Sequence, residues 1–499
     1  MSSSLHSAEQ LDVVVIGAGL SGINAAYRLQ EQCPGKSYAI LEARESMGGT
    51  WDLFRYPGIR SDSDIFTFGF GFKPWRGDKP LAEGAEILSY LRETTAENDI
   101  DRHIRYGTKV IAADWSTAEQ RWNLDLEVRT GDTVERRKLS ARFVYLCSGY
   151  YRYDAGYTPE FPGLGDFAGQ VVHPQFWPED LDYTDKRVVI IGSGATAVTL
   201  VPAMAPAAGH VTMLQRSPSW IGAVPSRDKI ADRLRAVLPA GLAHRLIRAK
   251  NITRGIAIYT YCRHNPQGAR KALTELATKV LGGDAAAVAE HFTPSYDPWD
   301  QRLCAAPGGD FFKAIRGGDA TVVTDRIDTF VPEGIRLVSG RVLEADLVVT
   351  ATGLQLSAGG GIEFCLDGRR ADLSESFLWR GAMVSGVPNL AVCMGYINAS
   401  WTLRADLSAR LVCRVLRYLD TENASSVSPR APEGMRRLPI IDLKSGYVQR
   451  SISEFPAQGP SGSWRVPQNY LIDRVATLRG GFGRDLELTT VTPRAEVLV

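Results

Sequence analysis

Three glycines near the start of the chain have the spacing of a loop that binds the diphosphate of a dinucleotide. In Gly17-Ala-Gly19-Leu-Ser-Gly22, the first glycine permits a tight turn and the second lets the backbone approach a diphosphate. The third allows a helix to pack closely on a strand. Glu42 follows 25 residues after Gly17, where its carboxylate can accept hydrogen bonds from both ribose hydroxyls. The acid favours an unphosphorylated ribose, and therefore FAD.

A second loop of the same kind begins 175 residues later, with Gly192-Ser-Gly194-Ala195-Thr196-Ala197. Ala197 takes the place of the third glycine, which is a tolerated variation. The next apolar run ends in Arg216-Ser217, at the position where the first unit has Glu42. A guanidinium there can hold a ribose 2′-phosphate through two hydrogen bonds, so we predict that the second loop binds NADPH. A plain surface charge is the alternative for Arg216.

Each loop needs a strand before it and a helix after it, and the sequence supplies both twice. Apolar runs at residues 12–16 and 187–191 precede the loops, and helical patterns follow them. Further apolar runs at 36–42 and 210–216 complete two βαβ units. The chain is therefore expected to contain two nucleotide-binding folds.

Two more apolar runs, 143–149 and 346–353, end in similar turns and fit buried strands of a parallel sheet. From Val224 to His291 the pattern becomes helical. We predict an α/β fold with two Rossmann-like dinucleotide-binding domains, for FAD and NADPH, and a helical insertion. The predicted divisions are 1–150 (FAD-binding domain, first part), 151–223 (NADP-binding domain, first part), 224–292 (helical insertion), 293–345 (NADP-binding domain, second part) and 346–499 (FAD-binding domain, second part, with a C-terminal element).

Charge and composition give no sign of a nucleic-acid partner. The 499 residues carry a net charge of +1, with basic and acidic residues interspersed, so small molecules are the expected partners. Residues 224–272 are a local exception, with eleven Lys or Arg against two Asp. A solvated helical face is the simpler explanation, and weak contact with an anionic membrane surface is the alternative.

The sequence contains no apolar run that suits a membrane span. The longest one, Val188 to Ala208, is broken by Gly192, Gly194 and Pro202. Residues 1–10 are polar and lack the apolar stretch of a signal peptide. The seven cysteines lie at least twenty residues apart, which is typical of reduced thiols and not of a disulfide framework or a metal site. We therefore expect a cytoplasmic protein without a metal, with contact to a membrane surface as the alternative.

A segment between the two loops narrows the choice among enzymes that use flavin and nicotinamide. Phe167-Ala-Gly169-Gln-Val-Val-His173-Pro-Gln-Phe-Trp177-Pro178 resembles the fingerprint of Baeyer-Villiger monooxygenases. The stretch from Gly48-Gly49-Thr50-Trp51 to Asp62 is similar to the flavin-side motif of class B flavoprotein monooxygenases. Residues 296–303 and 398–406 are most similar to the type I Baeyer-Villiger subgroup that activates the thioamide prodrug ethionamide.

The resemblance implies a reaction and two catalytic residues. NADPH reduces the flavin, dioxygen adds to give a 4a-peroxyflavin, and its attack on a ketone carbonyl leads to an ester or lactone, with sulfoxidation as a further activity. Arg302 matches the arginine that stabilises the negative oxygens, and Asp62 matches the acid that orients it. A structural ion pair is the alternative for Arg302. A turn cap is the alternative for Asp62, and Asp64 competes for its role.

Other positions receive indirect roles from the same resemblance. In the family, the fingerprint couples NADP binding to domain movement, so we expect His173 and Trp177 to act indirectly and His173 not to be a general base; a rigid linker is the alternative. Trp464 resembles an element that folds over the nicotinamide nucleotide, with a place in the core as the alternative. Many relatives have Lys directly before the active-site arginine, whereas this chain has Gln301, so its preference for NADPH is expected to be less strict.

These observations predict an FAD-dependent, NADPH-consuming Baeyer-Villiger monooxygenase of ketones or sulfides, of unspecified oligomeric state. One alternative is an N- or S-monooxygenase of the flavin-containing type that uses a protonated hydroperoxyflavin, which a cation at Arg302 disfavours. An NADPH oxidase or flavin reductase is another, and it would lack the fingerprint. A noncatalytic nucleotide sensor is disfavoured by the intact binding loops.

Overall fold

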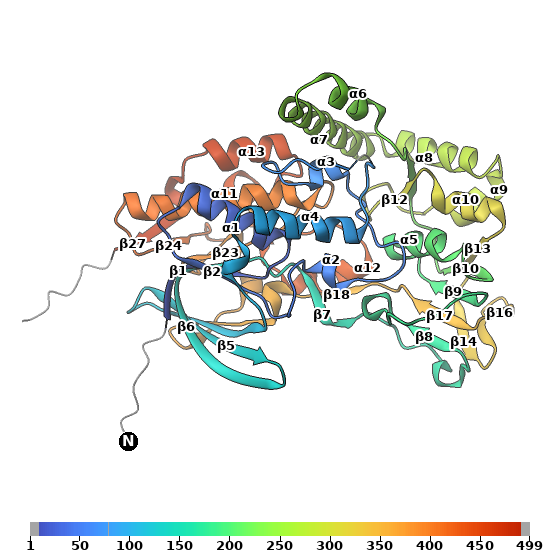
Figure 1. Ribbon diagram of the computed structural model, residues 1–499, viewed down its shortest axis with the longest axis horizontal. Coiled ribbons are helices and arrows are strands. Elements are labelled where there is room, and N and C mark those ends of the chain that lie inside the picture. The colour runs from blue at the N-terminus through green and yellow to red at the C-terminus, as the bar shows by residue number, and fades with distance from the viewer. Residues whose placement is uncertain (1–8, 78, 491–499) are drawn as a thin grey trace, which may run out of the picture.

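The computed structural model describes residues 9–77 and 79–490. Two sheet-containing units lie side by side, and a layer of helices covers the top of the second (Figure 1). Most of the polar N-terminal segment, residues 1–8 of 1–10, lies outside the described residues.

The larger sheet organises the first unit. Its central strands run parallel, in the order β6–β1–β2–β3, and β23 pairs with β6 in parallel as well. Because β1, β6 and β23 run the same way, their carboxyl ends meet at one edge, where ligands bind in open α/β sheets. Within the described residues this sheet comprises β1 (Glu9–Ile16), β2 (Tyr38–Leu41), β3 (Ile104–Arg105), β4 (Thr108–Ser116), β5 (Arg121–Thr130), β6 (Thr133–Leu146), β19 (Glu363–Leu366), β20 (Arg369–Arg370), β21 (Leu378–Trp379), β22 (Met383–Val384) and β23 (Leu390–Val392).

Alternate residues of β1 serve two different cores. Val13 and Val15 pack with the helices on one face, whereas Val14 and Ile16 pack with buried tryptophans of β4 and β5 on the other. Since neighbouring side chains of a strand point to opposite faces, a strand covered on both sides reads as a continuous apolar run. The helices of this unit are α1 (Leu20–Gln32), α2 (Thr50–Leu53), α3 (Ile65–Phe68), α4 (Gly84–Glu97), α11 (Trp401–Thr421), α12 (Gly446–Gln449) and α13 (Tyr470–Arg479).

The second sheet is parallel throughout, in the order β13–β10–β9–β17–β8. Its strands are β8 (Gln170–Val172), β9 (Arg187–Ile191), β10 (His210–Gln215), β13 (Ala320–Thr324) and β17 (Leu347–Thr350), with helices α5 (Ala195–Met204) and α10 (Asp310–Gly317). The membership of β17 corrects the boundary predicted at residue 346. The second sheet extends to Thr350, because a buried parallel strand has the same apolar pattern whichever sheet it joins.

Four helices lie between β11 and β12, within the range predicted to be a helical insertion. They are α6 (Lys229–Val237), α7 (Ala240–His264), α8 (Pro266–Val280) and α9 (Ala285–His291), and the flanking strands are β11 (Ile221–Val224) and β12 (Cys304–Pro307). In Figure 1 they form the green to yellow-green layer at the upper right. They therefore extend from the second unit towards helices of the first.

Two antiparallel segments connect the units: β7 (Tyr151–Gly156) leads from the first sheet to the second, and β18 (Leu354–Leu356) leads back. The remaining strands form small sheets: β14 (Ile327–Val331), β15 (Gly334–Leu337) and β16 (Val342–Glu344); β24 (Ser426–Pro429) with β27 (Leu486–Thr489); and β25 (Leu438–Pro439) with β26 (Ala457–Gln458).

Among the described residues, no helix is both long enough and apolar enough to cross a bilayer. All seven cysteines are unpaired, and six of them are buried.

Candidate functional site

The first glycine loop is closed in by backbone on several sides. Gly17 has a φ of +103°, and its N–H donates to the carbonyl of Leu41 at 2.8 Å. A Cβ at Gly17 would lie 2.8 Å from the carbonyl oxygen of Cys147, and one at Gly22 would lie 1.9 Å from that of Gly17. Both positions therefore exclude a side chain, and the amino end of α1 is left facing the strand ends, as a diphosphate site requires.

Glu42 holds this loop from the end of the neighbouring strand. Its side chain is buried, and its two oxygens accept the N–H groups of Ala18 at 2.7 Å and Arg44 at 3.0 Å. Burial raises the pKa of Glu42, while these two hydrogen bonds oppose the rise. Each carboxylate oxygen has a second acceptor direction, so both can still receive a ribose hydroxyl. The residues present therefore fit the adenosine part of FAD.

The flavin-side motif packs directly on the first loop. The N–H of Gly48 donates to the carbonyl of Ala18 at 3.0 Å, and a Cβ at Gly49 would lie 3.1 Å from the Cα of Gly19. Thr50 and Trp51 begin α2, and the indole of Trp51 meets Phe68 edge to face at 5.6 Å. The predicted residues Gly49, Thr50 and Trp51 are therefore gathered beside the first loop.

The second loop has the same turn but a more open surrounding. Gly192 has a φ of +136°, and a Cβ there would lie 2.3 Å from the carbonyl oxygen of Ala351. In contrast, nothing stands within 4 Å of a Cβ at Gly194. Gly194 and Ala195 are exposed at the start of α5, while Ala197 is buried against the sheet. The amino end of α5 is thus accessible for a phosphate group.

Arg216 occupies the place in the second unit that Glu42 has in the first. Glu42 directly follows β2, and Arg216 directly follows β10; each strand is the parallel neighbour of the strand that carries the glycine loop. Arg216 and Ser217 are exposed. Ser193 donates to the carbonyl of Ser217 at 3.1 Å, which ties this strand end to the loop. A cation beside an open loop fits a phosphorylated ribose.

The fingerprint segment forms the edge strand β8 and the short turn after it. Phe167 is buried in the core of the second unit, and a Cβ at Gly169 would lie 2.5 Å from the Phe167 ring. Trp177 packs against Tyr183 edge to face at 6.5 Å, next to Pro178. These contacts fix the course of the chain between the units.

His173 belongs to the connection between the two sheets. Its Nε2 lies 3.3 Å from the carbonyl oxygen of Gly353, just before β18, and its Nδ1 accepts the N–H of Gln175 at 3.1 Å. A Cβ at Gly156 would lie 2.2 Å from the imidazole, so the ring rests against the β7 backbone. Burial lowers the pKa of His173. Both ring nitrogens have backbone partners, which is a positioning arrangement.

Arg302 meets the acid predicted to orient it. Its guanidinium lies 3.8 Å from a carboxylate oxygen of Asp62; the Arg302 side chain is half-buried, and Asp62 is exposed. Arg302 also donates to the Tyr150 hydroxyl at 3.3 Å, and its Nε is a buried donor without a partner among the described residues. Tyr150 first, and then Tyr447 and Asp62, raise the pKa of Arg302 well above its usual value.

Asp64 has a different role from Asp62. Its carboxylate accepts the N–H of Thr67 at 3.0 Å and caps α3. Asp62 is therefore the acid brought to Arg302, and Asp64 is the helix cap, which separates two residues that the sequence left in competition.

Arg302 lies between the two glycine loops. Tyr150 comes two residues after Ser148, whose backbone faces Gly17 of the first loop. On the other side, Asp62 acts electrostatically on Tyr56, and the Tyr56 hydroxyl interacts with Thr196 of the second loop. Arg302, which has one unused donor, is thus linked to the first loop through Tyr150 and to the second through Asp62 and Tyr56.

The segment before Arg302 is anchored to three other parts of the chain. Asp297 pairs with Arg270 of α8 at 3.1 Å, and Asp300 pairs with Arg263 of α7 at 3.0 Å and with Lys444 at 2.8 Å. Between the two acids, Trp299 has a φ of +72°, a backbone region that tryptophan rarely adopts. Ion pairs and strained backbone together fix the position of the arginine.

Trp464 lies in the apolar core of the first unit. It is buried and meets Phe377 edge to face at 6.3 Å. This position favours the core alternative over a contact with the nicotinamide nucleotide. Its indole nitrogen has no hydrogen-bond partner among the described residues.

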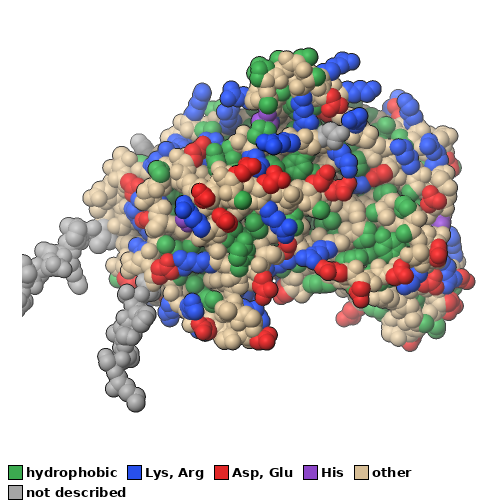
Figure 2. Space-filling view, viewed as in Figure 1, with side chains coloured by type: hydrophobic (Ala, Val, Ile, Leu, Met, Phe, Trp, Pro, Cys, Tyr) green, Lys and Arg blue, Asp and Glu red, His purple; other side chains and the backbone are tan. Residues whose placement is uncertain are grey.

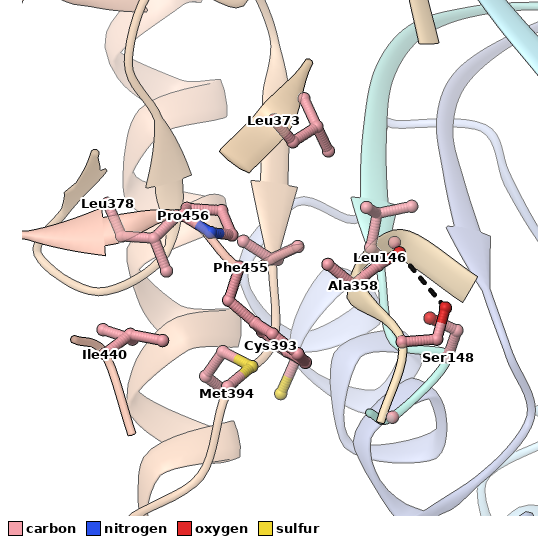
Figure 3. A pocket seen from close by; sticks show the side chains of 14 residues that line it. Leu146, Ser148, Ala358, Leu373, Leu378, Cys393, Met394, Ile440, Phe455 and Pro456 are labelled. Atoms are coloured by element: carbon pink, nitrogen blue, oxygen red, sulfur yellow. Dashed lines mark hydrogen bonds between the residues drawn. The ribbon is translucent and has the colours of Figure 1, made fainter. Parts of the chain in front are cut away.

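A narrow apolar pocket lies beside the carboxyl ends of β6 and β23; it holds about 420 Å³ of space, part of which is open to solvent. In Figure 3, Cys393 and Met394 follow β23 on one side, and Ser148 and Ala358 face them from the other. Leu373, Leu378, Ile440 and Phe455 complete the apolar wall.

Several residues near Arg302 were not singled out from the sequence. Tyr150 follows the turn at Ser148-Gly149, and Tyr447 comes from α12, almost 300 positions further along the chain. The Trp401 indole lies 5.0 Å from the Tyr150 ring and donates to Ser21 at 2.9 Å. The turn after Ser148 was a usable signal for Tyr150, whereas nothing in the local sequence points to Tyr447.

Two family models match the chain. Residues 15–77 match an NAD(P)-binding Rossmann-like domain, and residues 71–230 match the flavin-binding monooxygenase-like family. The first match contains the first glycine loop and the flavin-side motif, and the second contains the fingerprint.

Curated relatives match nearly the whole chain. The FAD-containing monooxygenase EthA of Mycobacterium tuberculosis is 52% identical over 476 residues, which are 95% of this chain and 96% of the relative. The probable FAD-binding monooxygenase AlmA of an Acinetobacter species is 48% identical over 93% of both chains.

Solved structures share the fold at lower sequence identity. A steroid monooxygenase bound to NADP matches with a TM-score of 0.74 at 22% identity, covering 97% of this chain and all of the other. A cyclohexanone monooxygenase from Rhodococcus bound to NADP⁺ matches with a TM-score of 0.71 at 20% identity over 97% of this chain. The two-domain architecture is common to all three.

Proposed function

Because this chain belongs to the family of FAD-containing monooxygenases that includes EthA, we propose that it is an NADPH-consuming Baeyer-Villiger monooxygenase that inserts one oxygen atom beside a ketone carbonyl. Bound FAD, once reduced by NADPH, would supply the chemistry that activates dioxygen. The product is an ester or lactone, and soft sulfur is a second class of substrate. The name of one solved neighbour, a cyclohexanone monooxygenase, supports a ketone as substrate.

The position of Arg302 carries this proposal. A guanidinium that has one unused donor and lies between the two loops can hold negative charge on a reacting oxygen. Asp62 keeps the side chain in place without a close contact, since their 3.8 Å separation leaves donors of Arg302 free for a ligand. Tyr150 accepts one hydrogen bond and limits rotation of the guanidinium. We assign Arg302 as the catalytic residue, and Asp62 and Tyr150 as positioning residues.

The two nucleotide sites divide the cofactors. We assign FAD to Gly17, Gly19, Gly22 and Glu42, with Gly49, Thr50 and Trp51 beside them. We assign NADPH to the loop from Gly192 to Ala197, with Arg216 and Ser217 reading the 2′-phosphate. The fingerprint residues Phe167, Gly169, His173, Trp177 and Pro178 set the connection between the sites.

The proposal is tested by product analysis of the FAD-loaded protein. We expect NADPH and air to convert members of a panel of ketones and sulfides into esters and sulfoxides, identified by mass. Arg302→Ala should lower ester formation about a hundredfold to a thousandfold, the size of effect seen when a preorganised charge-stabilising donor is lost. Flavin reduction by NADPH should remain within about threefold of wild type, because hydride transfer does not need this charge.

Other outcomes would select the alternatives. Ester formation by Arg302→Ala at the wild-type rate would refute the assigned role. Sulfoxides and amine oxides without any ester would favour an N- or S-monooxygenase. Consumption of NADPH with release of hydrogen peroxide alone, across the whole panel, would favour an NADPH oxidase.

We also propose that the outer face of α6 and α7 touches an anionic membrane surface. Six large apolar side chains of these helices are exposed, namely Ile230, Val237, Leu242, Leu246, Ile258 and Tyr261, with Val237 at 75%. Blue Lys and Arg side chains and green apolar side chains both reach the surface over the upper helices (Figure 2). An apolar face flanked by cations suits such an interface. Co-sedimentation with anionic vesicles that disappears in high salt supports this contact, and no binding at low salt refutes it.

A further inference from the structure

A second hollow lies well away from the strand ends, between the helical insertion and the loop before α4. It holds about 1350 Å³ of space, part of which is open to solvent. Its floor comes from α1, α3 and the loop at residues 72–76, and its roof comes from α6, α7 and the turn between them. We call it the insertion cleft. The residues that line it belong to neither glycine loop, and Arg302 and Asp62 are not among them.

The walls of the insertion cleft are aromatic and aliphatic. Tyr27 and Phe72 are stacked at 3.5 Å between ring centroids, and Phe66 and Trp75 add two further rings. Leu238 and Ile247 face them from the roof, together with Ala240. Such walls suit an apolar body, because flat rings bury a large area with little loss of side-chain freedom.

The charges of the cleft are mostly positive. Lys73, Arg76 and Arg235 line it, and Glu97 is the acidic residue among the described lining residues. Glu97 is already paired with Lys73 at 2.6 Å. Arg235 is occupied by the carbonyls of Gly77 and Trp75, and its guanidinium lies over the Phe66 ring at 4.8 Å.

Two polar groups of the cleft lack partners among the described residues. Arg76 is exposed and makes no hydrogen bond or ion pair there, and the buried Nε2 of His244 has no hydrogen-bond partner. A buried polar atom without a partner is uncommon and calls for an explanation. A polar group of a ligand would satisfy it, while Arg76 would meet the negative charge of the same ligand.

We propose that the insertion cleft binds an anionic amphiphile, that is, an apolar body carrying one carboxylate or phosphate group. The aromatic floor and the aliphatic roof enclose the apolar body. The anionic head lies towards Arg76 and His244, because Arg76 is a cation of the cleft that makes no hydrogen bond or ion pair among the described residues. This site is separate from the proposed catalytic centre, so it stands whether or not the chain oxidises ketones.

The test is calorimetric titration of the FAD-loaded protein with dodecanoate below its micelle concentration. We expect saturable binding of one molecule per chain that dodecan-1-ol does not match. Arg76→Glu should weaken the affinity about tenfold or more, the loss of one charge-assisted contact. Arg233→Glu is the matched control, since Arg233 is an exposed cation of α6 that does not line the cleft, and it should leave the affinity within about twofold of wild type.

A second pair of variants tests the place of binding by filling space. Ala240→Trp puts an indole into the cleft from the first turn of α7, and should weaken binding about tenfold or more. Gly241→Trp adds the same group one residue later, at an exposed position that does not line the cleft, and should not weaken it. Neither position is buried, so both proteins are expected to fold.

The source of the anion is distinguished by two further probes. If dodecyl phosphate binds as tightly as dodecanoate, the site recognises anionic head groups in general, and this result supports the proposal. The proposal is overturned if neither probe shows saturable binding. This holds also in the case in which only phosphatidylglycerol vesicles bind. Equal dodecanoate affinities for wild type, Arg76→Glu and Ala240→Trp overturn it as well, because the probe would then bind elsewhere.

Discussion

The two glycine loops share one backbone design, yet their surroundings differ. At the first loop, a Cβ at the second glycine, Gly19, would lie 3.6 Å from the Cα of Gly49, and the acid that holds the loop, Glu42, is buried. At the second loop, Gly194 has open space around it, and the cation at the same strand position, Arg216, is exposed. The same strand–turn–helix unit is thus closed in one half of the molecule and open in the other.

This difference teaches how one architecture can keep one nucleotide and exchange another. A site formed by buried groups must expose them to water before its ligand can leave, whereas a site made of an exposed loop and cation releases its ligand at small cost. The closed site suits FAD, which stays through the cycle that we propose. The open site suits NADPH, which must enter and leave in each cycle.

The largest expected effect comes from adding one methyl group to each loop. Gly22→Ala should lower the free energy of unfolding by about 3 kcal/mol, because its Cβ overlaps the carbonyl of Gly17 in a packed interior. The protein should then purify with little flavin. Gly194→Ala, a change at the second glycine of the open loop, should keep its flavin and unfold within about 0.5 kcal/mol of wild type, because nothing stands within 4 Å of the added Cβ.

Denaturant unfolding and the ratio of flavin to protein absorbance measure both variants. If Gly194→Ala lost its flavin as completely as Gly22→Ala, the contrast between a closed and an open site would be wrong.

The second effect concerns the buried acid. Glu42→Gln should weaken FAD binding about tenfold to a hundredfold, because the amide cannot accept from Ala18, Arg44 and the ribose with both of its polar atoms. Fluorescence titration of the flavin-free protein with FAD measures this affinity. Glu45→Gln, an exposed acid three residues further on, is the control. Equal affinities for Glu42→Gln and wild type would remove the residue from the site.

Third, Arg216→Ala should raise the KM for NADPH about tenfold and leave the KM for NADH within about twofold, because only the phosphorylated ribose needs the guanidinium. Steady-state rates at varied coenzyme concentration measure both constants. Lys186→Ala removes a cation from the opposite end of β9 and should change neither. An equal rise for both coenzymes would mean that Arg216 does not distinguish them.

Local sequence predicted the two loops and their strand partners well, since each βαβ unit is specified within some thirty residues. Glu42 and Arg216 follow equivalent strands, each paired in parallel with the strand that carries a glycine loop. The pattern did not tell which sheet β17 joins, because buried parallel strands look alike in any sheet. Sequence spacing gave no measure of how open each loop would be.

Side-chain pairing was predicted only where a family motif supplied it. Asp62 and Asp64 stand two residues apart in similar surroundings, and only the turn of the chain before α3 sends one to Arg302 and the other to the helix cap. Tyr447 reaches Arg302 from a helix that is distant in sequence. Such contacts depend on how domains pack together, which a local pattern does not encode.

The smallest expected effect lies in the connection between the closed and the open site. Asn at position 173 can still accept the N–H of Gln175, as asparagine does in a turn, but it is too short to reach the Gly353 carbonyl. His173→Asn should therefore leave FAD content unchanged and lower the rate of NADPH-driven turnover about threefold to tenfold. His264→Asn, at an exposed position near the end of α7, is the control.

The pH dependence of stability gives His173→Asn a second readout. Burial lowers the pKa of His173 below its ordinary value of 6.5, so the unfolded chain takes up a proton more readily than the folded one. The stability that this neutral imidazole allows is present above pH 6.5, and it is lost as pH falls from 6.5 through the lowered pKa. His103 and His244 are shifted in the same direction, so the variant should lose only part of the slope. Unfolding free energies at about pH 8 and about pH 5.5 measure it, and a slope identical to that of wild type would mean that folding does not shift the pKa of His173.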